Sequence, residues 1–261
     1  MVLGKKCIAI NRGTPAMIAA AAVTLEYKGL PQPVAYLVGD IGDGDGSRRL
    51  YDYLTGHIGD VPLSTLTLHY FQPDVGLFKR LLSVIDSLPG RPSLIADAGF
   101  MYVAKMSGHA PSFDLFTPDA GELAYLADEL APHPFYTRGF ILHDENQIPD
   151  LIERAYRHNN AATYLLVKGA TDFIADKNGV MSRVDSPREE AMEAIGGTGD
   201  TLTGIVSALI ESGLDTETAS IQAARVNRLA GSLARPTPAT QVYEIIRHIP
   251  QALNRVLTEK E

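Results

Sequence analysis

The stretch GGTGDTLTG, residues 196–204, decides the fold more than any other part of this sequence. Glycines run straight into an apolar segment that predicts a helix from about Thr198 to Ser212. Glycine lets backbone N–H groups turn toward a ligand, and the first turn of a helix leaves such groups without partners and carries a partial positive charge. The stretch therefore predicts an anion site suited to phosphate, with the carboxylate of Asp200 beside it. The alternative is that Thr198 or Asp200 only caps the helix.

Short β-rich runs alternate with helical segments upstream of this stretch. The runs that predict strands are residues 6–10, 34–38, 63–70, 93–96, 115–117 and 163–167. The segments that predict helices are residues 14–28, 48–54, 75–88, 120–130 and 148–158. Alternation of this kind favours a mostly parallel sheet covered by helices on both faces.

The pattern changes near residue 164. Asn178-Gly179 separates two short apolar runs, 173–175 and 180–184, and predicts a β-hairpin. From Gly197 onward the sequence predicts helices almost throughout, at residues 198–212, 216–233 and 241–258. Because no linker or repeat interrupts the chain, we expect a single domain over residues 1–261.

Composition narrows the class of protein. The chain has 261 residues, of which 45% are hydrophobic and 21% charged, so it can bury a proper core. Its formal net charge of -8 argues against nucleic acid or an anionic membrane as a partner. We expect neither a membrane span nor a signal peptide. The single cysteine, Cys7, is typical of a reducing cytoplasm, where we expect the protein.

Several common site motifs are missing from the sequence. We find no Walker-A loop, Gly-x-Gly-x-x-Gly fingerprint, Gly-x-Ser-x-Gly elbow or paired-cysteine zinc motif. The Gly/Asp run at 39–46 does not have calcium-loop spacing and is expected to be a turn before a helix. His69, His109 and His133 form no pattern with other ligands, so we expect them to be ordinary structural residues.

The quoted stretch resembles the C-terminal signature of the ribokinase-like superfamily, in which a Gly-x-Gly-Asp loop is the anion hole and the Asp is the catalytic base. Its double glycine and the following LTGIVSALI, residues 202–210, resemble the NAD(P)H-hydrate dehydratases more narrowly. TPDAGE at 117–122, LVKGA at 166–170 and IADA at 95–98 resemble segments of that family in the same order. The resemblance implies a ribokinase-like three-layer α/β/α fold, with a mostly parallel central sheet, an antiparallel hairpin edge and a helical C-terminal third.

The resemblance also implies an activity: nucleotide-dependent dehydration of hydrated NAD(P)H, by phosphoryl transfer to the hydroxyl followed by phosphate loss. The donor would be ADP or ATP, with Mg²⁺, and the substrate would be NADH-hydrate or NADPH-hydrate. The implied site residues are Asp200 as catalytic base; Gly197, Thr198, Gly199 and Lys168 for the anion hole and nucleotide phosphate; Gly169, Gly196 and Asn227 for the nucleotide; Asp97 and Asp119 for the substrate; and Glu122 for outer-sphere contact to Mg²⁺.

Structural alternatives remain for three of these residues. Lys168 could extend its ammonium from the sheet edge to solvent, Glu122 could be a favourable charge in the first turn of a helix, and Asp97 could cap the next helix. The chain also departs from the family: Asp119 stands where the dehydratases carry His, and Asn227 where they carry another His.

Further departures lie at Ala120, Arg228 and Ser232, and LVGD at 37–40 is more similar to a sugar-kinase segment. Two other functions therefore stay open, an ATP-dependent kinase of a small alcohol or sugar on the same fold and a nucleotide-sensing binding protein. The family tends to form oligomers, so a homo-oligomer is a further expectation.

Overall fold

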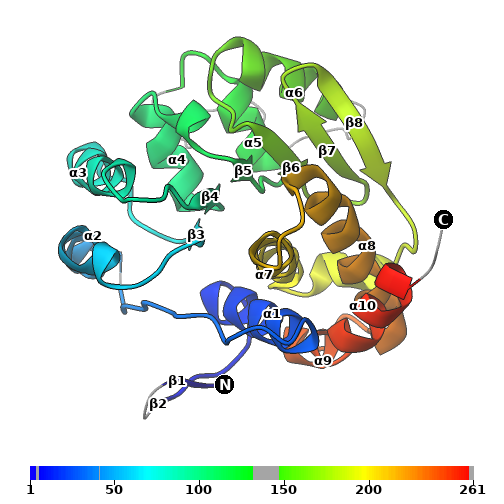
Figure 1. Ribbon diagram of the computed structural model, residues 1–261. Helices are drawn as coiled ribbons and strands as arrows, with labels where there is room; N and C mark the ends of the chain where they lie inside the picture. Colours follow the sequence, from blue (N-terminus) through cyan, green and yellow to red (C-terminus); the bar gives the residue numbers. More distant parts are fainter. Residues whose placement is uncertain (4–5, 41, 132–146, 259–261) are drawn as a thin grey trace. The chain divides into compact units, whose positions relative to one another are not determined.

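A computed structural model describes residues 1–3, 6–40, 42–131 and 147–258, so His133 lies outside the described residues. Its main feature is a six-stranded sheet whose strands follow one another in sequence order (Figure 1). The strands are β3 (Thr65–Leu68), β4 (Ser93–Ala96), β5 (Leu115–Phe116), β6 (Tyr164–Val167), β7 (Asp172–Asp176) and β8 (Gly179–Val184). β3 to β6 pair in parallel, whereas β7 pairs antiparallel to β6. The predicted parallel sheet with an antiparallel edge is confirmed.

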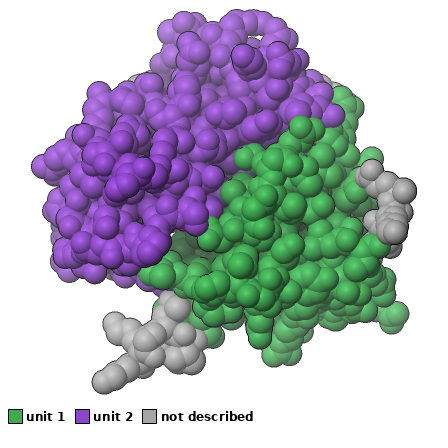
Figure 2. Space-filling model, in the orientation of Figure 1, with its two compact units in different colours: residues 1–34, 170–172, 182–261 green, residues 35–169, 173–181 purple. Residues whose placement is uncertain are grey.

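The chain divides into two compact units (Figure 2). Unit 2 comprises residues 35–169 and 173–181 and holds most of the sheet. Its helices are α2 (Asp45–His57), η1 (Ile58–Asp60), α3 (Val75–Asp86), α4 (Gly99–Met106), η2 (Ala110–Ser112), α5 (Ala120–Ala127) and α6 (Ile148–Arg157). Edge-to-face ring pairs of Phe100 with Phe78 and Phe113 lie in its core, so aromatic packing fixes α3 and α4 against each other.

Unit 1 comprises residues 1–34, 170–172 and 182–261. It holds β1 (Val2–Leu3), β2 (Lys6–Cys7), α1 (Thr14–Tyr27), η5 (Glu190–Ala194), α7 (Thr198–Glu211), α8 (Thr216–Ala234), α9 (Val242–Ile246) and α10 (Ile249–Thr258). α1 and α7 pack at close range, because a Cβ on Gly204 would lie 2.2 Å from the carbonyl oxygen of Met17. The predicted helical C-terminal third is confirmed, and the single domain over residues 1–261 stays a prediction.

Three local predictions were wrong. Residues 34–38 form no strand: Pro31 and Pro33 precede them, and Val38 is 40% exposed. Among the described residues, β3 is an edge strand hydrogen-bonded to β4 only, and residues 34–38 do not pair with its open edge, so their β-propensity alone did not make a strand.

The other two differences concern helices. α4 was missed because it is only eight residues long and begins with glycine; a Cβ on Gly99 would lie 2.6 Å from the carbonyl oxygen of Phe71. The helix predicted at 241–258 is two helices, α9 and α10, since Pro250 lacks the N–H that would continue the first one. None of the helices in the described ranges is both long and apolar enough to cross a bilayer.

Candidate functional site

Gly197 forms the turn that starts α7. Its φ is 103°, in the region that L-residues with a side chain avoid. A Cβ there would lie 3.0 Å from Cα of Arg12 and 3.2 Å from both γ-carbons of Val242. Within the described residues no side chain caps this helix terminus. The amides of its first turn, at Thr198 and Gly199, therefore remain suited to bind an anion.

Asp200 lies in that first turn and is tied to a distant part of the chain. Its Oδ2 accepts a hydrogen bond of 2.7 Å from the backbone N–H of Gly13. Gly13 is the N-cap residue of α1, so the N-termini of α1 and α7 meet at this carboxylate. The bond fixes the orientation of a group that is only partly buried. A fixed, partly accessible carboxylate beside first-turn amides has the geometry expected of a general base.

Asn227, which lies in α8, forms hydrogen bonds with the same turn. Its side chain is buried, Nδ2 donates to the carbonyl oxygen of Thr198 at 3.1 Å, and Oδ1 accepts from the hydroxyl of Thr201 at 2.7 Å. The hydroxyl of Thr198 donates to the carbonyl oxygen of Ile195 at 3.2 Å. Both ends of the Asn227 amide thus hold α7 in place, and its predicted contact with the nucleotide stays a prediction. Gly196 is exposed beside this turn.

A second group of predicted residues lies in unit 2, where parallel strands end. Asp97 follows β4 and is 1% exposed; its Oδ1 accepts from Nζ of Lys168 at 2.8 Å and from the backbone N–H of Ala98 at 2.8 Å. Lys168 follows β6 and is followed by the exposed Gly169. The ammonium of Lys168 bonds to Asp97 and does not simply extend to solvent. The carboxylate of Asp97 bonds to Lys168 and does not simply cap the next helix. Strand ends of this kind are where open α/β sheets bind ligands.

Asp119 and Glu122 start α5 with reciprocal hydrogen bonds. Oδ1 of Asp119 accepts from the N–H of Glu122 at 2.8 Å, and Oε2 of Glu122 accepts from the N–H of Asp119 at 2.9 Å. This is a capping box, so Glu122 has a structural role in the first turn of α5. Burial, and then the charge of Asp119, raise the pKa of Glu122 to about 8, while Lys168 lowers it. Glu122 also accepts a long hydrogen bond, 3.4 Å, from the hydroxyl of Tyr102.

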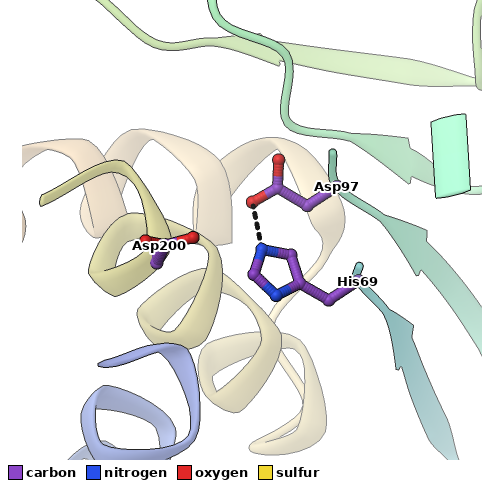
Figure 3. Close-up of side chains that lie close together, drawn as sticks. All are labelled: His69, Asp97 and Asp200. Atoms are coloured by element: carbon purple, nitrogen blue, oxygen red, sulfur yellow. Dashed lines mark ion pairs between the residues drawn. The ribbon is translucent and has the colours of Figure 1, made fainter. Parts of the chain in front are cut away.

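His69 is a residue of this group that the sequence analysis passed over. It follows β3, is 4% exposed, and its Nε2 lies 3.6 Å from Oδ2 of Asp97 (Figure 3). The signal that could have found it is the one used for Asp97 and Lys168, a polar residue directly after a parallel strand. The Gly13–Asp200 hydrogen bond was also missed, because it joins residues 187 positions apart.

The architecture defines the class of protein: this is a ribokinase-like fold. The structure is similar to that of the pyridoxal kinase from Entamoeba histolytica, with a TM-score of 0.61 and 16% identity. The similarity covers 94% of this chain and 92% of the kinase chain. The structure is also similar to that of the ADP/ATP-dependent NAD(P)H-hydrate dehydratase from Bacillus subtilis that was co-crystallized with ATP/Mg²⁺. That likeness covers 92% of this chain and 84% of the other, with a TM-score of 0.55 and 15% identity. At such identities the likenesses show the fold alone.

The family follows from the sequence. A family model described as NAD(P)H-hydrate dehydratase matches residues 76–251, and the chain belongs to this family. An uncharacterized protein of Methanocaldococcus jannaschii is 43% identical over 242 residues, 92% of this chain and 100% of the relative. The ADP-dependent (S)-NAD(P)H-hydrate dehydratase of Cenarchaeum symbiosum is 30% identical over 121 residues, 46% of this chain and 37% of that protein.

Proposed function

We propose that this protein dehydrates hydrated NAD(P)H with an adenine nucleotide, in the cytoplasm. The observation that carries the proposal is the start of α7, where a glycine at φ 103° and uncapped first-turn amides adjoin a carboxylate held by Gly13. Family membership supports the substrate class, hydrated NADH or NADPH. Relatives named as ADP-dependent and ADP/ATP-dependent dehydratases support an adenine nucleotide as the phosphoryl donor.

The proposed reaction begins with phosphoryl transfer. Asp200 takes the proton of the substrate hydroxyl, whose oxygen attacks the terminal phosphorus of the nucleotide as the bond to the leaving nucleotide breaks. Amides of Thr198 and Gly199 stabilise the negative charge on the transferring group, because they are already aimed at it and need no reorganisation. Gly197 and Gly196 form the turn, and Asn227 keeps it in position through Thr198. In this scheme Lys168 and Gly169 contact the nucleotide, and Asp97 and Asp119 the substrate.

The carboxylate group at the start of α5 fits a magnesium ion. Burial raises the pKa of Glu122, and the negative charges of Asp119 and Asp97 raise it further, while the charge of Lys168 offsets part of the effect. Oxygen ligands, partly through water, are what Mg²⁺ prefers. When bound, Mg²⁺ would neutralise charge on the polyphosphate. Glu122 would hold it through water and Asp119 would keep Glu122 in place.

The test is a product assay with the hydrates and with ADP or ATP. We expect dihydronicotinamide absorbance to return as inorganic phosphate is released. Asp200→Asn should lower turnover by roughly 10²–10⁴-fold, the usual contribution of a general base, while nucleotide still binds. Asp215→Asn is the matched control: Asp215 caps α8 through the N–H of Thr218, and asparagine caps equally well.

Other products would point to other functions. A stable phosphorylated alcohol would replace this proposal by the small-molecule kinase. Nucleotide binding without turnover of any acceptor would indicate the sensor. An Asp200→Asn variant with full activity would remove the base assignment.

A further inference from the structure

His69 and Asp97 form a buried imidazole–carboxylate pair at the ends of β3 and β4. Oδ2 of Asp97 lies 3.6 Å from Nε2 of His69 (Figure 3). Oδ1 of Asp97 accepts hydrogen bonds from Nζ of Lys168 and from the N–H of Ala98, each at 2.8 Å. The ring of Tyr70 packs on the imidazole, with 4.2 Å between the ring centroids. An imidazole beside a carboxylate that is itself held in place is an arrangement that general bases use.

The proposed dehydration, on which this inference rests, needs a second base. Hydration of a ring double bond adds a hydroxyl to one carbon and a hydrogen to its neighbour. Dehydration must remove both. Asp200 accounts for the hydroxyl proton, but the carbon-bound hydrogen has no acceptor among the residues assigned so far. A kinase would stop at the phosphate ester and would need no such group.

We propose that His69 removes this carbon-bound proton. After phosphoryl transfer, the C–O bond to the phosphate breaks and its electron pair leaves with the phosphate. The lone pair of the ring nitrogen forms a C=N⁺ bond. The neighbouring C–H bond then breaks: its proton passes to the imidazole of His69, its electron pair forms the ring C=C bond, and the C=N⁺ electrons return to nitrogen. The products are inorganic phosphate, the dihydronicotinamide and an imidazolium facing Asp97.

Burial of the pair suits this chemistry. The C=N⁺ intermediate reacts with water at the carbon that lost phosphate, and that reaction regenerates the hydrate. Each such event would consume one nucleotide without forming product. A base that is 4% exposed, beside a carboxylate that is 1% exposed, acts where water is excluded.

The experiment compares His69→Gln with the wild-type protein and with His57→Gln. His57 lies at the exposed end of α2, where its contacts in the described part of the chain are with Tyr53, through the carbonyl oxygen and the stacked ring, so its replacement is the matched control. Three quantities are measured: phosphate released, dihydronicotinamide formed, and the rate with substrate deuterated at the carbon next to the hydroxyl carbon.

For His69→Gln we expect dihydronicotinamide formation to fall by roughly 10²-fold or more, the lower end of the range for a general base. Phosphate release should fall much less, so the ratio of phosphate to product should rise above one. The deuterium isotope effect should increase, because C–H cleavage becomes rate-limiting. In His69→Ala, added imidazole should restore part of the product.

Two outcomes would overturn the proposal while leaving the dehydratase function intact: one phosphate per product in His69→Gln, or an unchanged isotope effect with near-normal turnover. Misfolding is checked by the rise in melting temperature on adding nucleotide, which a folded variant retains. If the wild-type protein forms no dihydronicotinamide from either hydrate, the proposed function itself fails, and that result is distinct from a failure of the His69 assignment.

Discussion

Replacing Gly197 by alanine tests the anion hole without touching a charged or hydrogen-bonding side chain. The backbone at Gly197 has φ 103°, and an alanine side chain there costs about 1–2 kcal/mol of conformational strain. The new Cβ would also lie 3.0 Å from Cα of Arg12 and 3.2 Å from the two γ-carbons of Val242. Overpacking of this kind costs about 1–3 kcal/mol, because backbone and a β-branched side chain have little room to move. The expected loss in the free energy of unfolding is therefore about 2–5 kcal/mol.

Gly213 supplies the control, since it lies at the other end of α7. Its φ is 94°, but a Cβ there would meet no atom within 4 Å. Gly213→Ala should therefore carry the strain alone, about 1–2 kcal/mol. Chemical denaturation of both variants at one temperature separates strain from steric overlap.

Activity gives the second measurement. The turn at Gly197 relieves its overlap by moving away from Arg12, and this displaces the amides of Thr198 and Gly199. Misplacement by about 1 Å costs roughly 10²-fold in rate, so phosphoryl transfer should fall by that order in Gly197→Ala and stay near normal in Gly213→Ala. If Gly197→Ala loses stability as expected but transfers phosphate at the wild-type rate, the amides of this turn do not stabilise the transferring group and the reasoning is refuted.

Two further predictions concern buried polar side chains. Asn227→Ala removes one buried partner each from the carbonyl oxygen of Thr198 and the hydroxyl of Thr201, which keep the 2.7 Å bond between them, so the free energy of unfolding should fall by about 0.5–1.5 kcal/mol for each bond lost. We expect kcat to fall more than the KM for nucleotide rises, and the reverse split in steady-state kinetics would show that Asn227 contacts the nucleotide directly. Burial, partly offset by Asp128, lowers the pKa of Lys105 to about 8 from 10.5, and the unfolded state therefore binds more protons between these values. Stability relative to Lys105→Met should increase with pH over that range, by at most about 3.4 kcal/mol in denaturation curves, and a flat difference would contradict the assignment.

Local patterns predicted much of the fold and part of the site. Glycines before an apolar helix predicted the start of α7 because both signals act within one turn of chain. The ends of two strands predicted Asp97 and Lys168 as candidate site residues. A polar residue directly after a buried parallel strand lies at the sheet edge where such folds bind ligands. The prediction failed at residues 34–38, where β-propensity was read without knowing whether a partner strand exists.

These local patterns could not predict contacts between residues that are far apart in the sequence. The hydrogen bond from Gly13 to Asp200 depends on how α1 packs on α7, and that packing depends in turn on Gly204 lacking a side chain. His69 had the same local signal as Asp97 and Lys168. It was set aside because a single histidine has no partner in a sequence, whereas the fold places Asp97 3.6 Å from its ring.

Glu122 has a structural role in the capping box of α5, and we propose a second, functional role for the same carboxylate. A carboxylate in the first turn of a helix stabilises it most when it is ionised, because the helix N-terminus carries a partial positive charge. If helix stability alone had shaped the start of α5, Glu122 would be ionised and far from other negative charges. Instead burial, and then the charges of Asp119 and Asp97, raise the pKa of Glu122 to about 8, so an ionised Glu122 in the capping box carries a free-energy cost at neutral pH. Perturbed carboxylates of this kind concentrate at sites where a ligand supplies the missing charge. The capping box explains where Glu122 points, and the carboxylates of Asp97, Asp119 and Glu122 near Lys168 support the proposed cation site.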